Sequence, residues 1–142
     1  MNDPYDQFLN QIPPSSNPPL VSIYHAVRNL PYGSIGQRDP ADVLTNRRGS
    51  CSGKHLLLRN LLRRTGHEAH IITMFTHFES RLTPHPSFPP ELNDLLTQGQ
   101  VPDFHHYVRA RPTPDSPWLN LDATWHDPLT PYSFPVNSSF DG

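Results

Sequence analysis

Proline restricts this chain more than any other residue type. The sequence holds 18 prolines in 142 residues, at least twice the share of about 5% found in average proteins. They gather at residues 13–19, 83–90 and 112–117, with further turn residues after 127. Because proline interrupts helix interiors and central strands, regular structure must fall between these clusters. The sequence therefore predicts short elements joined by long loops.

The overall composition favours a single domain over residues 1–142. The net charge of -2 argues against nucleic acid or an anionic membrane surface as a partner. The lone cysteine, Cys51, excludes a disulfide within these residues and fits a reducing compartment. No apolar run approaches the length of a membrane span, and no basic-then-apolar signal opens the chain. We therefore expect a cytoplasmic protein.

Helical signals lie between the proline clusters. Residues 1–18 read as a proline-rich arm without a core of its own. Apolar residues at three- and four-residue spacing predict a helix over residues 20–30. Asp39 and Pro40 supply an N-cap and first-turn proline for a short helix over 40–45. The longest helix is expected from about residue 50 to 65, with Gly66 following its end.

Three strands are expected after the long helix. Residues 67–76 are apolar on both faces, which indicates a central strand. Residues 104–111 and 118–124 read as an antiparallel hairpin across a proline-rich turn. The insertion at 77–103 is long enough for a lid or binding segment and holds one short helix near 89–96. Residues 128–142 are expected to form an extended tail.

Cys51 is placed where a nucleophile would be activated. It opens the longest predicted helix, and the unpaired N–H groups of a first helical turn favour the thiolate over the thiol. A histidine and an aspartate follow on strand-like segments. This order is typical of enzymes that transfer acyl groups through a Cys-His-Asp triad.

Four segments carry a family resemblance. Residues 47–51 match the pattern R-x-G-x-C, and residues 61–70 match a helix end followed by a strand. Residues 105–108 match H-x-W-V, and residues 118–124 match W-x-x-x-D-P-T. In this order, across roughly residues 20–125, the chain resembles the transglutaminase-like superfamily of papain-like folds.

The resemblance implies a fold and a reaction. The fold would be α+β, with a papain-like, transglutaminase-like core in which the nucleophile helix packs on a short antiparallel sheet. Cys51 would be the nucleophile, His105 its base, and Asp122 the group that orients the imidazole. The reaction would be acyl transfer through a thioester, from a small-molecule or peptide amide or ester to water or an amine. No cofactor is implied.

Some positions depart from the family pattern or bear on the substrate. Tyr107, which stands where the family has tryptophan, and Tyr32, a candidate to line the cleft, are both candidate substrate contacts. His55 lies one helical turn after Cys51 and so should face the same side. It reads either as a substrate contact or second proton carrier, or as a partly buried helix histidine. The adjacent His106 should point to the opposite face of its strand from His105.

Other interpretations remain open at this point. One alternative is a non-catalytic binding module on the same scaffold. Cys51, His55, His105 and Asp122 together would be a chemically reasonable zinc set. Arg59, Arg63 and Arg64 form either a solvated helix face or a docking site for an acidic carrier protein.

Overall fold

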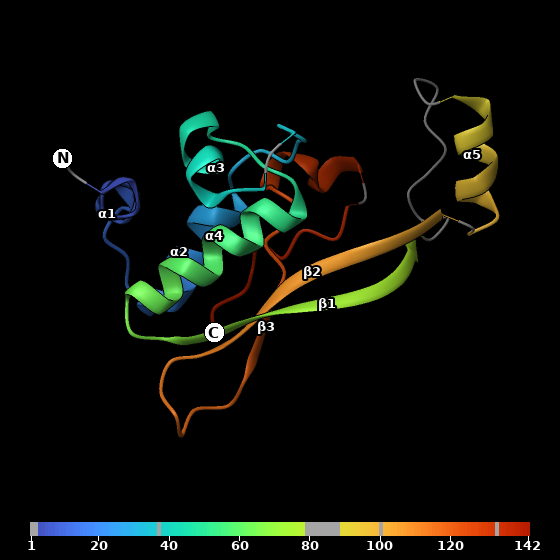
Figure 1. The fold of residues 1–142 in the computed structure, drawn as a ribbon. Coiled ribbons are helices and arrows are strands. Elements are labelled where there is room, and N and C mark those ends of the chain that lie inside the picture. Colours follow the sequence, from blue (N-terminus) through green and yellow to red (C-terminus); the bar gives the residue numbers. More distant parts are fainter. Residues whose placement is uncertain (1–2, 37, 79–88, 100, 133) are drawn as a thin grey trace.

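The computed structural model describes residues 3–36, 38–78, 89–99, 101–132 and 134–142. It has the expected α+β architecture: α4 packs on β1 and β2, and α2 and α3 pack on α4 (Figure 1). In chain order the elements are α1 (Pro4–Gln11), α2 (Pro19–Arg28), α3 (Pro40–Asn46), α4 (Cys51–Arg64), β1 (Glu68–Phe78), α5 (Pro90–Thr97), β2 (Val101–Arg111), β3 (Leu119–Leu121) and the 3-10 helix η1 (Asp127–Tyr132).

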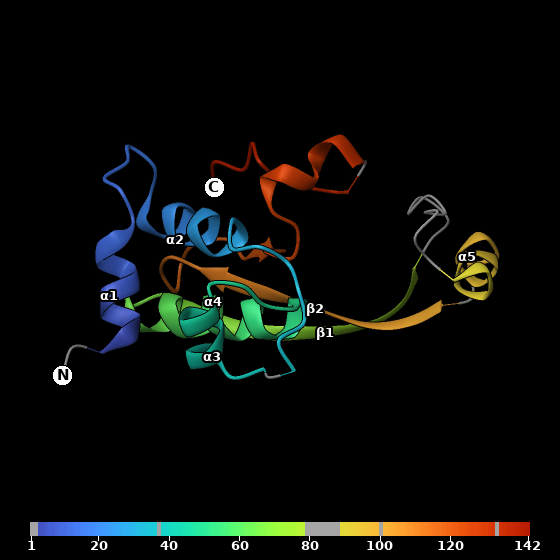
Figure 2. The same ribbon diagram turned by 90° about the horizontal axis from the view of Figure 1, so that it is seen from above.

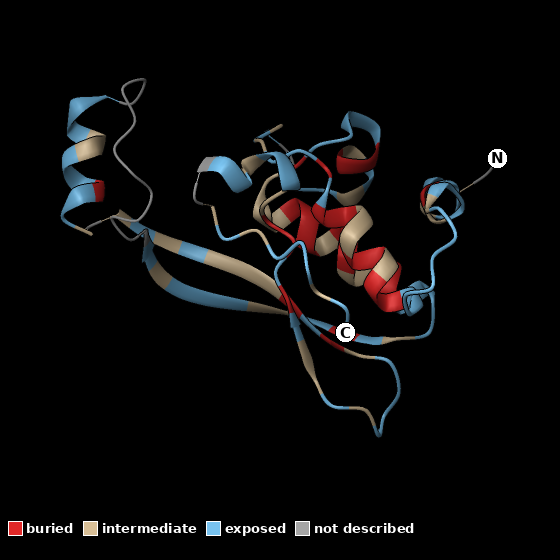
Figure 3. Cartoon of the chain, turned by 180° about the vertical axis from the view of Figure 1, so that it is seen from behind, coloured by how far each residue is buried: buried red, intermediate tan, exposed pale blue. Residues whose placement is uncertain are grey.

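The core forms around one face of α4. Four leucines of this helix are fully buried between α2 and the sheet (Figure 3). The side chains that meet them include Leu20, Val27, Ala69, Val108 and Ala110. Because the leucines recur at helical spacing, a single apolar stripe holds both neighbouring layers together. The core thereby fixes the N-terminus of α4 against the middle of β2.

The helices expected from the sequence are confirmed. The Asp39 carboxylate accepts a hydrogen bond from the Ala41 N–H at 2.8 Å, with Pro40 as the first residue of α3. Helix α4 begins at Cys51 and is followed by Gly66 at a φ of 85°, a left-handed conformation that glycine adopts without strain.

The N-terminal segment differs from the expected arm. Residues 4–11 form helix α1, and Phe8 on this helix is 5% exposed within the core. Arg64, at the end of α4, pairs with Asp6 at 2.6 Å and with Asp3 at 3.1 Å. Tyr5, Phe8, Leu9 and Ile12 do recur at helical spacing and pack on the core. The proline-rich, polar surroundings led the sequence analysis to pass over this short period.

The sheet corrects one expectation. Its order within the described residues is β1-β2-β3, all antiparallel, so β1 is an edge strand and β2 the central one. The hairpin of β2 and β3 is confirmed, although β3 is only three residues long. The apolar faces of β1 misled the prediction because Met74 and Phe75 are exposed rather than covered.

Strands β1 and β2 continue beyond the body as a two-stranded ribbon that carries α5 at its far end (Figures 1 and 2). Helix α5 confirms the short helix expected within 77–103, while residues 79–88 lie outside the described residues. Phe75 and Phe104 pair across the ribbon with ring centroids 5.3 Å apart, and both are more than half exposed. A lid or binding role for this insertion stays a prediction.

The C-terminal segment is only partly the expected extended tail. Residues 127–132 form η1, and Phe140 returns to α2, where its ring lies 5.1 Å from that of Tyr24. Within the described ranges, no helix combines the length and the apolar character that crossing a bilayer demands.

Candidate active site

Cys51 is the first residue of α4 and is partly buried. The loop before it is held beside a second loop by hydrogen bonds from the Gly33 N–H to the Gly49 carbonyl at 3.0 Å and from the Gly49 N–H to the Pro31 carbonyl at 3.1 Å. A Cβ on Gly49 would lie 3.0 Å from a methyl of Val43, so a larger residue here would require the Val43 side chain to move. Because Cys51 is the first residue of α4, its thiol lies at the positive end of the helix dipole.

His105 and Asp122 meet beside this helix end. His105 lies on β2, and Asp122 is the first residue after β3. The β2–β3 ladder pairs Val108 with Leu121. This register brings the side chains of His105 and Asp122 close together. The Nε2–H of His105 donates to Oδ2 of Asp122 at 2.6 Å. His105 also forms a side-chain hydrogen bond with Cys51, for which its other ring nitrogen is left.

The pKa values of Cys51 and His105 move in opposite directions. Burial alone would raise the pKa of the Cys51 thiol, but hydrogen bonds with His105 and Ser52 and the charge of His105 outweigh it, so this pKa lies below 9.0. The hydrogen bond to Asp122, and then that to Cys51, raise the pKa of His105 to about 10. The thiol therefore loses its proton before the imidazolium does, and both shifts favour a thiolate–imidazolium pair over a neutral thiol and imidazole.

The Asp122 carboxyl group is held in its ionised form. Burial alone would raise its pKa, but hydrogen bonds from His105 and Thr124 hold the pKa well below the ordinary range of a carboxyl group. Oδ1 accepts from both the N–H and the hydroxyl of Thr124, at 3.0 and 2.5 Å. This leaves Oδ2 for His105.

The two adjacent histidines have separate partners. His106 does not take part in the contact with Asp122; its Nδ1 lies 3.3 Å from the hydroxyl of Ser52. That hydroxyl is 3.9 Å from the Cys51 sulfur. The strand register expected from the motif thus agrees with the geometry.

The candidate substrate contacts Tyr32 and Tyr107 lie in different surroundings. Tyr32 is 37% exposed, and burial together with the negative charges of Cys51 and Asp103 raises its pKa, which places it beside the thiol. Its ring lies 4.7 Å from that of Trp125. Tyr107 is partly buried on the same strand as His105. No hydrogen bond joins Tyr107 to Cys51 within the described ranges.

The structure corrects the expectation that His55 contacts the substrate. It is fully buried, so the structure does not place it where a substrate would touch it. Its Nε2 accepts a hydrogen bond from the Ala123 N–H at 2.7 Å and lies 3.5 Å from Asp122. Because the Ala123 N–H can only donate, Nε2 carries no proton and the proton of the neutral ring is on Nδ1. Burial lowers the pKa of His55 in the same sense. The sequence interpretation as a buried helix histidine is the one that fits.

Sequence reasoning missed Asp103, whose charge acts on both Cys51 and Tyr32. Strand alternation could have revealed it, because Asp103 lies two residues before His105 and so on the same face of β2. It also missed Thr124, which holds the Asp122 carboxylate. The presence of a threonine in the family's motif does not by itself predict that its side chain binds the Asp122 carboxylate.

The zinc interpretation is not supported. In the part of the chain that the structure describes, no group of three or more histidine, cysteine or acidic residues is placed to hold a metal ion. The lone pair of His55 Nε2, which would be needed for a metal, is already used by the Ala123 N–H.

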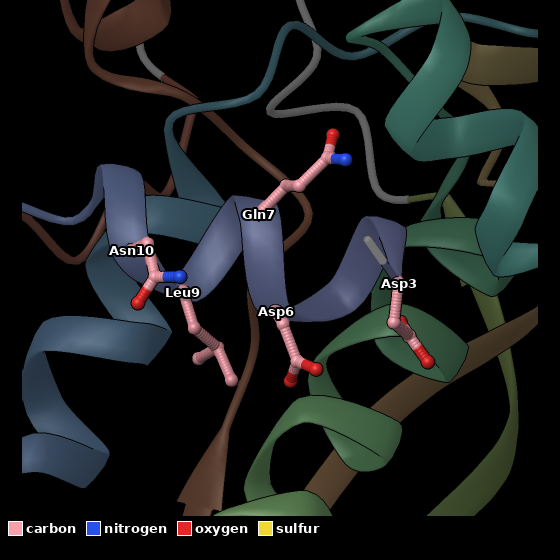
Figure 4. Close-up of a pocket in the computed structure, with 5 residues that line it drawn as sticks. All are labelled: Asp3, Asp6, Gln7, Leu9 and Asn10. Carbon is pink, nitrogen blue, oxygen red and sulfur yellow. The ribbon is translucent and has the colours of Figure 1, made fainter. Parts of the chain in front are cut away.

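The arginines expected on α4 are engaged within the chain. Arg63 donates to the Ala69 carbonyl at 2.7 Å, and Arg64 binds Asp6 of α1 and Asp3, the N-cap of that helix. A surface hollow of about 400 Å³ lies on α1, lined by Asp3, Asp6, Gln7, Leu9 and Asn10 (Figure 4). Because Arg64 already occupies its two carboxylates, this hollow is not a second candidate for the active site.

Comparison with known proteins agrees with this geometry. The family model described as the Transglutaminase-like superfamily matches residues 9–123. A search of curated proteins finds no match.

Proposed function

Because the chain belongs to the transglutaminase-like superfamily, we propose that it is a cysteine-dependent acyltransferase or amide hydrolase. Cys51 is the nucleophile, His105 the acid and base, and Asp122 the group that fixes the imidazole. The observation that carries this proposal is the 2.6 Å contact between His105 and Asp122 beside a thiol whose pKa is lowered by the same histidine.

The first half-reaction forms a thioester. The Cys51 thiolate attacks the carbonyl carbon of an amide or ester, and the resulting oxyanion is stabilised by backbone N–H groups at the start of α4, which have no partner within the helix. The C–N or C–O bond of the donor then breaks. The leaving amine or alcohol takes its proton from the His105 imidazolium.

The second half-reaction releases the acyl group. Water or an amine gives a proton to His105 as it attacks the thioester, which yields an acid or a new amide and restores the thiolate–imidazolium pair. The donor is a small molecule or a peptide. Tyr32, exposed beside the thiol, is the side chain best placed to contact it.

Mass spectrometry tests the proposal directly. The protein is incubated with p-nitrophenyl acetate and, separately, with a peptide amide, and the intact mass is followed over time. We expect one acetyl group on Cys51 that hydroxylamine removes, as a thioester requires. Cys51→Ala should form no adduct, and His105→Ala should form it much more slowly. An adduct that persists in Cys51→Ala would contradict the proposal.

A binding module on the same scaffold is the competing function. It would bind its ligand without an adduct, and its thiol would react with iodoacetamide only near the ordinary pKa of about 8.5. That result would remove the enzymatic proposal and keep the family membership.

A further inference from the structure

Three fully buried polar side chains of the helical layer converge on the short segment 122–124. Tyr24 is 1% exposed, and Lys54 and His55 are not exposed at all. Burial of a polar or charged group costs free energy unless the group is hydrogen-bonded. Their partners therefore indicate why the fold keeps them there.

Each of the three binds a different backbone group of this segment. The Tyr24 hydroxyl donates to the carbonyl of Asp122 at 3.0 Å. The Ala123 N–H donates to His55 Nε2 at 2.7 Å. The Lys54 ammonium donates to the carbonyl of Thr124 at 2.8 Å.

These three hydrogen bonds take the place of the β2–β3 backbone hydrogen bonds, which end before residue 122. The pairing of β3 with β2 stops at Leu121, where the chain bends so that Asp122 meets His105. An unsatisfied buried backbone group costs about 1–3 kcal/mol. The three side chains satisfy these groups without a further strand.

Lys54 also ties this segment to the end of α2. Its two other protons go to the carbonyls of Arg28 at 2.9 Å and Leu30 at 2.7 Å. Carbonyls at a helix C-terminus lack partners within the helix, so one ammonium group connects α2, α4 and the segment after β3.

We propose that Tyr24, Lys54 and His55 are positioning residues: they hold the backbone of residues 122–124 so that Asp122 presents Oδ2 to His105. With the backbone fixed, the hydroxyl and N–H of Thr124 occupy Oδ1, and only Oδ2 faces the imidazole. The inference rests on the proposed function, because orienting His105 matters for catalysis only if His105 serves Cys51.

The test measures the titration of His105 by NMR of its imidazole ring, which requires no substrate. In the unsubstituted protein we expect a midpoint far above the ordinary value of about 6.5. Tyr24→Phe removes one hydroxyl and should lower that midpoint by about one pH unit, a tenfold loss of proton affinity. Tyr5→Phe is the matched control, because the Tyr5 hydroxyl is also hydrogen-bonded, to Asn60 at 3.3 Å, but lies on α1.

His55 offers a rescue pair. His55→Leu deletes the acceptor of the Ala123 N–H and should lower the His105 midpoint, whereas His55→Gln keeps an acceptor near the position of Nε2 and should restore much of it. Should His55→Leu fail to fold, Tyr24→Phe still decides. An unchanged His105 midpoint in a folded Tyr24→Phe would overturn the positioning role. An elevated midpoint that depends on Tyr24, in a protein that forms no acyl adduct, would keep the positioning role and reject the proposed function.

Discussion

Replacement of Asp122 by asparagine tests the proposed triad most sharply. Asparagine keeps the size and keeps Oδ1 as an acceptor for Thr124, but it places an NH₂ group against Nε2 of His105, where the carboxylate now accepts at 2.6 Å. Nε2 must then accept, so the ring proton moves to Nδ1. The nitrogen facing Cys51 loses the lone pair that takes the thiol proton.

The magnitude follows from the pKa of His105. That pKa is raised from 6.5 to about 10, and the contributions of Asp122 exceed those of Cys51. Each pKa unit corresponds to about 1.4 kcal/mol. Loss of Asp122 therefore removes roughly 2–3 kcal/mol of imidazolium stability, or about a hundredfold in proton affinity.

The assay is the pH dependence of Cys51 alkylation by iodoacetamide. In the unsubstituted protein the Cys51 thiol loses its proton while the His105 imidazolium is still charged. In Asp122→Asn the imidazole loses its charge at lower pH, so the thiol must deprotonate beside a neutral ring. We expect the midpoint of alkylation to rise by at least about one pH unit and the rate near pH 6 to fall about tenfold or more.

Asp127→Asn is the matched control. The Asp127 side chain has the same 48% exposure as that of Asp122, and it pairs with Arg28 at 2.7 Å rather than with His105. It should lower the melting temperature and leave the alkylation midpoint unchanged. If Asp122→Asn behaves in the same way, Asp122 has only a structural role and the reasoning is refuted.

Four further predictions can be checked with the same protein. His105→Ala should abolish alkylation of Cys51 at low pH, whereas His106→Ala should largely preserve it; the reverse result would mean that the other histidine serves the thiol. Asp103→Asn should lower the alkylation midpoint, because the charge of Asp103 raises the pKa of Cys51; an upward shift would contradict its placement. Phe8→Ala should lower the free energy of unfolding in urea by about 3–5 kcal/mol, and a change below about 1 kcal/mol would exclude α1 from the core. A chelator should leave the alkylation rate unchanged, and a loss of rate together with bound zinc would revive the metal interpretation.

The sequence was informative where chemistry and local pattern coincide. The placement of Cys51 at the start of α4 could be predicted because a leucine period and a motif agree on the helix start. The choice of His105 over His106 came from the register of the family motif, and strand alternation then placed His106 on the opposite face. Both depend only on neighbours along the chain.

Burial could not be read from the same pattern. Lys54 carries a charge, and nothing in its local sequence separates it from a solvated helix position, yet it is fully buried on three carbonyls. In contrast, Phe75 looks like a core residue but is 61% exposed on the ribbon. Tertiary partners decide both cases, and these partners are distant in sequence.

The depressed pKa of Cys51 also makes the thiol a reporter of folding. His105 and Asp122 reach it from separate elements, so an unfolded chain has an ordinary thiol with a pKa of about 8.5. Near pH 6, iodoacetamide should therefore label folded molecules faster than unfolded ones, the opposite of what a buried core cysteine shows. Contacts between distant parts of a chain form slowly. A pulse of reagent during refolding would thus mark the moment at which the hairpin of β2 and β3 docks against α4.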